Sequence, residues 1–332
     1  MKNATLIAVD LAKNVFVLHA VDHKGKKLFT RKLSRDKFHS FIESQPQTLF
    51  VMESCSGAHY WARLCFRNGH KAQLISPQYV KPFVKTNKND ARDAEAIAEA
   101  ASRPNMRFVS VKSPEQQDIQ AIHRIRKGCI RDRTAHANRI RGHLAEHGIA
   151  LPKGINVLRK RLPHVLDDVD NELTFLARDY LSDLYADLIH LDERIEKYDR
   201  LLKEWARENE DCTRLMTIPG VGLITATIIC AAAGDGSEFR NGRHFAAWLG
   251  LTPRQHSSGG RNRLLGISKH GDSYIRTQLI QGAHNLARRA PTPWLANLVE
   301  RRGYNKACVA QANKTARIAW AVLVRKESYR AA

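Results

Sequence analysis

The sequence lacks several features that define common classes of protein. No apolar run approaches the ~18 residues that a membrane span needs, and the opening MKNATLIAVD is too short and too soon charged for a signal peptide. The six cysteines, at positions 55, 65, 129, 212, 230 and 308, include no CxxC pair and no regular spacing. We therefore expect reduced thiols, mostly in cores, and a cytoplasmic protein.

Acidic residues are scarce relative to basic ones. The chain has 54 Lys and Arg against 33 Asp and Glu, which gives a net charge of +21 and a pI near 10.0. Such a charge favours polyanionic partners through counterion release, so nucleic acid is the leading inference. The alternative is a basic protein that associates with anions without further function, such as a ribosome-associated factor.

The charge is also unevenly distributed. Residues 101–161 carry 14 basic residues against 4 acids, and residues 261–332 carry 14 against 3. Residues 167–211 between them carry 15 acids against 6 basic residues. This pattern predicts distinct surfaces, one of which meets a protein rather than DNA.

A length of 332 residues predicts two domains and a connector.

The first hundred residues alternate strand and helix patterns. Periodicity predicts the order βββαβαβα, which is that of the ribonuclease-H-like fold, where three antiparallel strands lead into parallel ones. The expected strands are 5–12, 14–22, 26–34, 48–54 and 71–77, and the expected helices are 35–44, 57–69 and 89–101.

The middle of the chain is helical. Residues 114–148 read as one long basic helix, and an apolar seam with spacings of four and three follows in the acidic segment. The seam predicts a coiled coil that packs on another protomer or folds back on the preceding helix. Its members are Ala177, Leu181, Leu184, Leu188, Leu191, Ile195, Tyr198, Leu202 and Trp205.

Residues 215–234, LMTIPGVGLITATIICAAAG, carry a helix–hairpin–helix pattern. Gly220 and Gly222 would let backbone amides approach a phosphate at a helix N-terminus. The alternative is a tight helix–helix turn with nothing bound, and the basic composition favours contact with the DNA backbone. Amphipathic basic helices are expected over 271–290 and 305–327.

Four carboxylates suggest metal-dependent chemistry. Asp10 ends the first predicted strand and Glu53 the fourth, while Asp90 and Asp93 lie three apart on one face of a helix. In a ribonuclease-H-like sheet these groups converge, and two Mg²⁺ ions would relieve their repulsion and organise an in-line attack on phosphate. The alternative is that they are strand-end caps and solvated positions.

The segment RQHSSGGRNR, residues 254–263, places Ser257 and Ser258 before paired glycines among cations. It is not a nucleophile elbow and has no identifiable His–Asp pair, so local sequence favours a phosphate-binding loop. The surrounding cations are Arg254, Arg261, Arg263 and Lys269. Cys55 and His59 suggest a thiol–imidazole pair but have no third, orienting group, so we expect Cys55 to be a small core residue.

Six motifs together resemble the insertion-sequence 110 family of transposases. They are VDLAKN, MESCSGAHYWA, KTNKNDARDAEAIAEA, IPGVGLITA, FAAWLGLTPRQHSSGG and ISKHGD, and they span essentially the whole chain. The resemblance implies a RuvC-like DEDD nuclease domain over 1–108. It also implies a basic helix with an acidic coiled coil over 113–208, and a Transposase 20 domain with a helix–hairpin–helix and a catalytic serine loop over 209–332.

The resemblance also implies roles. The DEDD carboxylates fall on Asp10, Glu53, Asp90 and Asp93, and the serine that links covalently to DNA falls best on Ser258, with Ser257 its competitor. Family members exchange strands between a circular donor and a target under the direction of a bridge RNA. The resemblance also implies a tetramer, or dimer of dimers, in which the RuvC-like domain of one protomer meets the serine domain of another. A bacterial protein acting on the nucleoid is implied.

Two other functions stay open at this point. A RuvC-like junction resolvase would use the same metals with water as the nucleophile, and Ser258 would only contact phosphate. A nucleic-acid-binding scaffold with a decayed ribonuclease-H-like fold would not cleave DNA. The presence of all four carboxylates argues against decay.

Overall fold

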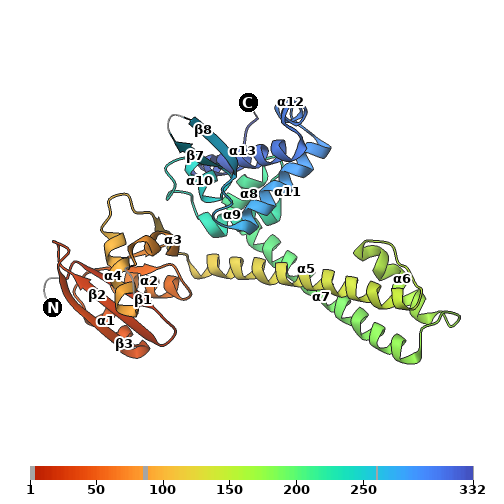
Figure 1. Ribbon diagram of the computed structural model, residues 1–332, viewed down its shortest axis with the longest axis horizontal. Coiled ribbons are helices and arrows are strands. Elements are labelled where there is room, and N and C mark those ends of the chain that lie inside the picture. Colours follow the sequence, from red (N-terminus) through yellow and green to blue (C-terminus); the bar gives the residue numbers. More distant parts are fainter. Residues whose placement is uncertain (1–3, 85–88, 259–260, 332) are drawn as a thin grey trace. The chain divides into compact units, whose positions relative to one another are not determined.

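A computed structural model of the chain describes residues 4–84, 89–258 and 261–331, and it leaves out the side chains of Ser258 and Asn262. The first four residues of the KTNKNDARD motif and both glycines of HSSGG therefore lie outside the described residues. The chain divides into two compact units, Met1–Ser113 and Pro114–Ala332 (Figure 1). None of the helices in the described ranges is long and apolar enough to cross a membrane.

The first unit is built on a six-stranded sheet with the strand order β3-β2-β1-β4-β5-β6. β1 pairs antiparallel with β2 and β2 with β3, whereas β4 runs parallel to β1 and β5 parallel to β4. The strands are β1 (Leu6–Leu11), β2 (Val15–Val21), β3 (Lys27–Ser34), β4 (Leu49–Glu53), β5 (Lys71–Ile75) and β6 (Phe108–Val109). The expected βββαβαβα order is confirmed, and β6, which pairs antiparallel with β5, is an addition.

Helices cover both faces of this sheet. Because side chains alternate along a strand, Ile7 and Val9 of β1 join one cluster while Ala8 joins the other. The first cluster holds α1 (Arg35–Ser44) and α2 (Ala58–Arg67), and the second holds α4 (Asp90–Ala101). The small side chain of Ala8 faces α4, which packs against β1 and β4. A short helix, α3 (Pro77–Val80), and a 3₁₀ turn (Lys81–Phe83) precede α4.

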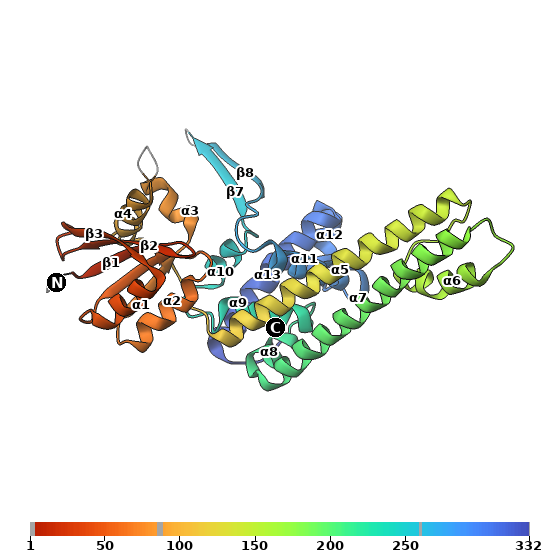
Figure 2. The same cartoon turned by 90° about the horizontal axis from the view of Figure 1, so that it is seen from below.

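The second unit begins with an antiparallel helical hairpin. α5 (Pro114–Glu146) and α7 (Phe175–Glu208) lie side by side, and the connection between them contains α6 (Ile155–Asp167) (Figure 2). Leu144 of α5 packs in one cluster with Leu181, and Ile119 packs with Leu202 at the other end. Residue numbers thus rise along one helix as they fall along the other. The apolar seam folds back on the preceding helix, as one of the two sequence alternatives predicted.

Opposite charges also meet across this hairpin. The Arg133 guanidinium lies 2.7 Å from the Asp192 carboxylate, and Arg126 lies 2.5 Å from Asp199. Asp192 is buried, so its pairing is specific and not a surface contact. At these places the acidic block faces the basic block of the same chain, whereas the sequence alone suggested a surface for a separate protein.

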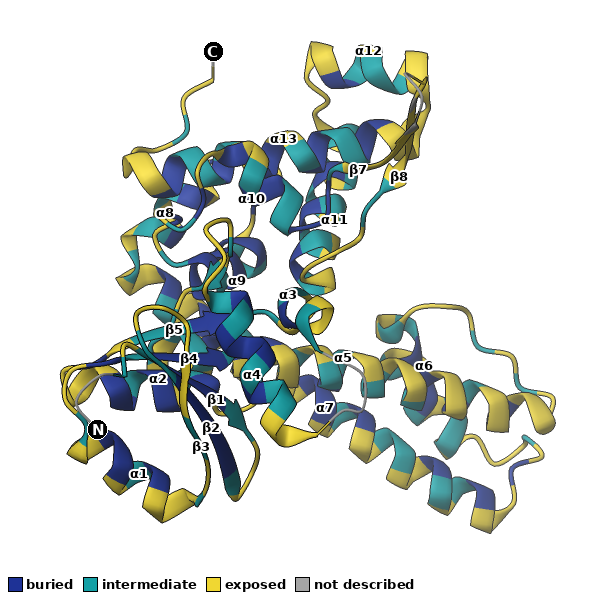
Figure 3. Ribbon diagram, turned by 60° about the vertical axis from the view of Figure 1, so that its left-hand side comes forward, coloured by how far each residue is buried: buried dark blue, intermediate teal, exposed yellow. Residues whose placement is uncertain are grey.

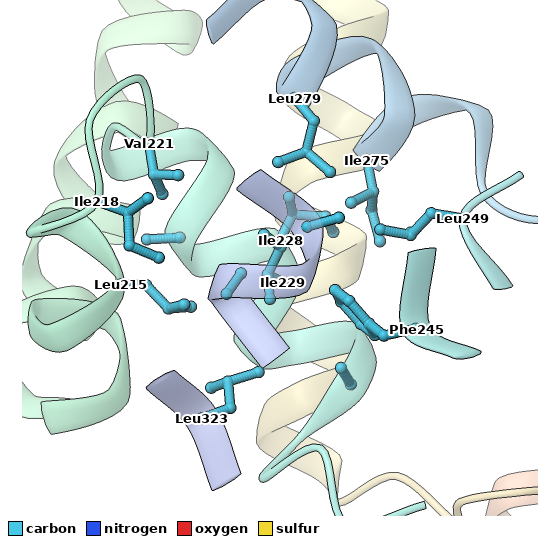
Figure 4. Packing of buried hydrophobic residues seen from close by; sticks show 14 of the residues in the cluster. Leu215, Ile218, Val221, Ile228, Ile229, Phe245, Leu249, Ile275, Leu279 and Leu323 are labelled. Atoms are coloured by element: carbon cyan, nitrogen blue, oxygen red, sulfur yellow. The ribbon is translucent and has the colours of Figure 1, made fainter. Parts of the chain in front are cut away.

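A helical bundle completes the second unit. Its central helix, α9 (Leu223–Ala233), is apolar on all sides and is packed around by neighbours, as Figure 4 shows for Ile228 and Ile229. The bundle consists of α8 (Glu210–Met216), α9 (Leu223–Ala233), α10 (Gly242–Trp248), α11 (Ser273–Arg289), α12 (Pro293–Arg302) and α13 (Tyr304–Arg325). The sequence predicted the helices around the 215–234 motif and those matching α11 and α13, but it did not anticipate α10 or α12, nor α6 of the preceding hairpin.

The segment that sequence reasoning treated as a loop is a β-hairpin. β7 (Pro253–Ser258) pairs antiparallel with β8 (Arg261–Ile267), and most of its residues are exposed (Figure 3). A Gly-Gly pair between two strands is a strong hairpin signal. The segment expected to be a phosphate-binding loop thus forms two paired strands, which an exposed ribbon can do without an alternating apolar pattern, while phosphate binding stays a prediction.

Candidate active site and nucleic-acid interface

Asp10 and Glu53 are neighbours at the carboxyl ends of two parallel strands. The register of β1 on β4 pairs Ala8 with Val51 and Val9 with Met52, so the next residues along the two strands are Asp10 and Glu53. Both are half-buried. Side chains at the same position on adjacent parallel strands project from the same face, so the register brings these two carboxylates into one neighbourhood.

Cys55 gives a second indication that these carboxylates share one site. The pKa of its thiol is raised by burial and then by the negative charges of Glu53 and Asp10. A single thiol that responds to both charges must lie near both. Its sulfur contacts the carbonyl oxygen of Leu11 at 4.0 Å. The end of β1 and the loop after β4 therefore form one electronegative region in which the Cys55 thiol is poorly ionised.

Asp90 and Asp93 both lie in the first turn of α4. The Asn89 side chain caps this helix by accepting a hydrogen bond from the Arg92 amide at 2.9 Å. Negative charge is stabilised at a helix N-terminus, so two acids are tolerated in the first turn. Asp90 is exposed and Asp93 is half-buried. The apolar face of α4 fixes the helix against the sheet that carries Asp10.

The described structure gathers two of these acids, not four. Within residues 4–84, 89–258 and 261–331, no group of three or more His, Cys, Asp or Glu side chains lies close enough to hold a metal ion. Asp10 and Glu53 supply the paired carboxylate oxygens that Mg²⁺ prefers, so this pair suits a hard divalent cation. The acids of α4 do not join it in a ligand group in this arrangement.

His59 has a hydrogen-bond partner other than Cys55. Its Nδ1 accepts a hydrogen bond from the Lys112 amide at 3.2 Å. Burial, followed by the charges of Lys112 and Arg63, lowers the pKa of His59 to about 4. The imidazole is therefore neutral at physiological pH and ties the loop before α5 to α2, within the first unit.

The β7–β8 register separates the two serines. Ser258 is paired with Arg261 and His256 with Arg263, so these positions belong to one face of the ribbon. Ser257 is paired with Asn262 and belongs to the other face, where its hydroxyl accepts a hydrogen bond from Gln255 at 2.9 Å. Arg261 and Arg263 are exposed, as is Arg254, which lies at an irregularity of the ladder.

Tight backbone contacts fix the base of this hairpin. The Lys269 amide donates to the Gly250 carbonyl at 3.1 Å, and the Arg276 side chain donates to the carbonyls of Leu249 and His270. A Cβ on Gly271 would lie less than 3.0 Å from the Trp248 carbonyl oxygen, so no side chain fits there. Sequence reasoning assigned Lys269 to phosphate binding. The exposed Lys269 side chain permits that role. The sequence analysis did not identify the structural contribution of Arg276, Gly250 or Gly271.

Gly220 and Gly222, the two glycines of the α8–α9 turn, differ in their surroundings. Gly220 has a φ of +83° and its backbone approaches that of Gly282 in α11, so that a Cβ on Gly282 would overlap the Gly220 carbonyl. This explains Gly220 by packing. Gly222 precedes α9 as its N-cap, and a Cβ there would meet open space. Both glycines are exposed, and their contact with a phosphate stays a prediction.

A basic groove that the sequence did not reveal lies between α10 and α13. It has a volume of about 430 Å³, and its lining includes Arg243, Lys314 and Arg317. Lys314 and Arg317 are three residues apart on α13, which places them on one face of the helix. That spacing could have been found in the sequence. The clustering of Arg243 with them depends on how α10 packs.

Comparisons with known proteins agree with this arrangement. Residues 7–149 match a DEDD-type transposase family profile, and residues 212–300 match the profile described as "Transposase IS116/IS110/IS902 family". These two matches define the protein as a DEDD-type DNA transposase. The chain belongs to the IS110 family of transposases.

Three relatives are similar over nearly the whole chain. The transposase for insertion sequence element IS1111A of Coxiella burnetii is 47% identical over 99% of this chain and 92% of its own length. A probable family 20 transposase of Pseudomonas aeruginosa is 45% identical over 99% of both chains. The transposase for insertion sequence element IS1328 of Yersinia enterocolitica is 42% identical over 97% of both. The family resemblance inferred from the motifs is confirmed.

Membership of this family fixes the coarse function. The protein is a DNA-processing enzyme that acts in transposition, its substrate is DNA, and its first unit is a ribonuclease-H-like DEDD domain. DEDD-type transposase domains typically use divalent metal ions.

Proposed function

We propose that the protein transposes its element by DNA strand cleavage and exchange, with Mg²⁺ held by a carboxylate cluster and Ser258 as the nucleophile. The proposal depends most on the parallel register of β1 and β4, which makes Asp10 and Glu53 neighbours. The remaining ligands would come from Asp90 and Asp93 at the start of α4. Ser258 would come from the β7–β8 hairpin of the second unit.

The carboxylate half of the site would bind the scissile phosphate. Bound Mg²⁺ would neutralise the acids and stabilise negative charge on the phosphate and on the leaving oxygen. Asp10 and Glu53 hold the strand-end side of the site, since both are anchored in the sheet. Asp90 and Asp93 are carried by one helix face, so a small approach of the α4 N-terminus would bring in both together.

The serine half of the site would carry out the covalent step. The Ser258 oxygen bonds to phosphorus while the bond from phosphorus to the 3′-oxygen breaks, and the serine proton leaves with the 3′-hydroxyl. A 5′-phosphoserine link results, and the 3′-hydroxyl of a second strand reverses the step. The hairpin register supports Ser258 over Ser257 because its position shares a face with Arg261 and Arg263. These guanidinium groups would stabilise the negative charge that develops on the phosphate oxygens.

The partners that we propose are donor and target DNA, a structured bridge RNA and further copies of the chain. The net charge of +21 supports simultaneous binding of two nucleic acids. The two halves of the site belong to separate compact units, which permits the RuvC-like unit of one protomer to serve the serine hairpin of another in a tetramer or dimer of dimers.

Trapping of protein–DNA adducts tests the mechanism. A labelled donor strand incubated with Mg²⁺ and the full chain should give a covalent adduct that is absent in Ser258→Ala and retained in Ser257→Ala. Asp10→Asn should abolish both adduct and cleavage while nucleic-acid affinity survives. If Ser258→Ala still cleaves the strand, water is the nucleophile and the protein acts as a junction-resolvase-like enzyme instead.

The RNA partner is tested separately. RNA that copurifies with the full chain should be sequenced, and we expect a structured transcript from DNA adjacent to the transposase gene. Copurified RNA with no enrichment for that region would contradict the guide proposal and leave the metal and serine chemistry standing.

A further inference from the structure

A cavity on the second unit has a lining unlike that of the basic groove. It has a volume of about 750 Å³ and lies between α11 and the start of α13. Gln281, His284, Asn285, Arg288 and Tyr304 line it. Volumes of this order accommodate small organic ligands. The lining contains no acid and only one permanent positive charge.

The four residues from α11 share one face of that helix. Positions 281, 284, 285 and 288 follow the spacing i, i+3, i+4 and i+7. The opposite face, with Ile275, Leu279 and Ala283, is buried in the core shown in Figure 4. Packing therefore explains one side of α11. It does not explain why the other side gathers two amides, an imidazole and a guanidinium around a hollow.

Two aromatic rings, one from α11 and one from the start of α13, contribute to the lining. The centroids of His284 and Tyr304 lie 5.2 Å apart with the rings tilted by 39°. The Tyr304 hydroxyl donates a hydrogen bond to the His284 carbonyl at 3.2 Å, which holds the start of α13 against α11. Tyr304 remains 36% exposed, so its ring is accessible to a ligand.

This combination suits a nucleobase better than a phosphate. The amides of Gln281 and Asn285 each offer a donor and an acceptor, which matches the edge of a base and adds no charge for a phosphate. An aromatic ring supplies a stacking surface. The α10–α13 groove, with three cations, has the composition of a phosphate contact. A base enters a hollow only when it is out of a duplex stack.

We propose that this cavity binds an unpaired base of a single-stranded nucleic acid. Gln281 and Asn285 pair with the base edge, Tyr304 stacks on the base, and Arg288 holds a flanking phosphate. The proposal relies on nucleic acid as the protein's substrate and is independent of the metal and serine chemistry. DNA and RNA single strands offer the same groups, and the test below separates them.

Binding of short oligonucleotides to the full chain tests this site. Fluorescence anisotropy should compare a 12-nucleotide DNA strand, an RNA strand of the same sequence and the corresponding DNA duplex. We expect the double variant Gln281→Ala with Asn285→Ala to weaken binding of at least one single strand by about 5- to 30-fold. Duplex affinity should change less than about 2-fold. The strand that is affected identifies DNA or RNA as the source of the base.

A matched pair of arginines controls for general charge. Arg288 and Arg289 are adjacent on α11 and both are exposed, but only Arg288 lines the cavity. Arg288→Ala should weaken single-strand binding several-fold more than Arg289→Ala. Equal losses in the two variants, or equal losses for single strand and duplex, would overturn the proposal in favour of a charge-driven or duplex-reading surface.

Photocrosslinking locates the base directly. Strands that carry 5-iodouracil, as deoxyribonucleotide or ribonucleotide, should crosslink to Tyr304 or His284, as identified by mass spectrometry of the peptides. Tyr304→Phe keeps the ring and should retain binding of the single strand. Crosslinks confined to other segments, or no loss of affinity in the double variant with either strand, would show that the cavity does not bind a base. Because Asp10→Asn retains nucleic-acid binding in our proposal, these outcomes are separate from failure of the cleavage mechanism.

Discussion

Replacement of Gly271 by alanine tests whether the base of the β7–β8 hairpin positions the serine half of the site. Gly271 has a φ of +78°, which costs a non-glycine residue ~1–2 kcal/mol. Its Cβ would also lie less than 3.0 Å from the Trp248 carbonyl oxygen, a backbone atom that cannot rotate away. Relief of such an overlap typically costs ~1–3 kcal/mol. We therefore expect a loss of about 2–5 kcal/mol in the free energy of unfolding.

The expected loss can be measured by thermal unfolding followed by circular dichroism at 222 nm. For a unit of this size, 1 kcal/mol corresponds to roughly 2–4 °C, so a 3 kcal/mol loss lowers the Tm of the helical unit by about 6–12 °C. Because the overlap pushes the Lys269–Asp272 segment away from α10, the cleavage rate at a temperature where the variant is folded should fall at least tenfold.

Gly266→Ala is the matched control. Gly266 lies in β8 of the same hairpin, has no positive φ, and a Cβ there would meet open space. Its stability should change by no more than about 0.5 kcal/mol. A Gly271→Ala protein with unchanged Tm and unchanged cleavage would refute the argument that these contacts fix the hairpin.

Three further predictions concern the helical hairpin, pH and metal. Asp192→Ala should destabilise the protein by about 1–3 kcal/mol in urea unfolding, because it leaves the partly exposed Arg133 and Arg159 without the carboxylate that lies 2.7 and 3.1 Å from them. Asp183→Ala, exposed on the same helix, should change stability by under about 0.5 kcal/mol. Burial, as the largest cause, lowers the pKa of His123 to about 4, so between pH 4 and 6.5 the unfolded chain binds a proton that the folded chain does not. The free energy of unfolding should therefore be highest above pH ~6.5 and fall by about 3 kcal/mol toward pH 4. In His123→Gln, urea midpoints should vary less with pH over this range. Removal of divalent ions by a chelator should abolish strand cleavage, and addition of Mg²⁺ should restore it. Cleavage that continues without metal would contradict the role of Asp10 and Glu53.

The sequence carried much of the first unit because its signals are local. The strand ending at Asp10 and the strand ending at Glu53 are apolar runs bounded by polar turns, and α4 is an alanine-rich segment that follows an asparagine cap. Once the order of elements predicted the fold, the neighbour relation of the first and fourth strands followed. The register that aligns Asp10 with Glu53 is a property of the paired strands.

The second unit was less predictable because its decisive contacts join distant residues. The apolar seam of α7 was visible, but its partner was open until Leu181 and Leu144 were found in one cluster. Gly220 was assigned to a phosphate from its motif, whereas its conformation and its contact with Gly282 explain it by packing. No local pattern connects residues 62 positions apart.

By itself the sequence determined the excess positive charge, the order of strands and helices, and the acids at the strand ends, since each depends on composition or on neighbours along the chain. Only the tertiary structure decided that the acidic helix pairs with the basic one. It also decided that the serine segment is a hairpin in which positions 257 and 258 belong to opposite faces, and that α11 and Tyr304 line a polar cavity. These features depend on strand register and on close backbone approach between distant segments, which are settled only when the chain packs.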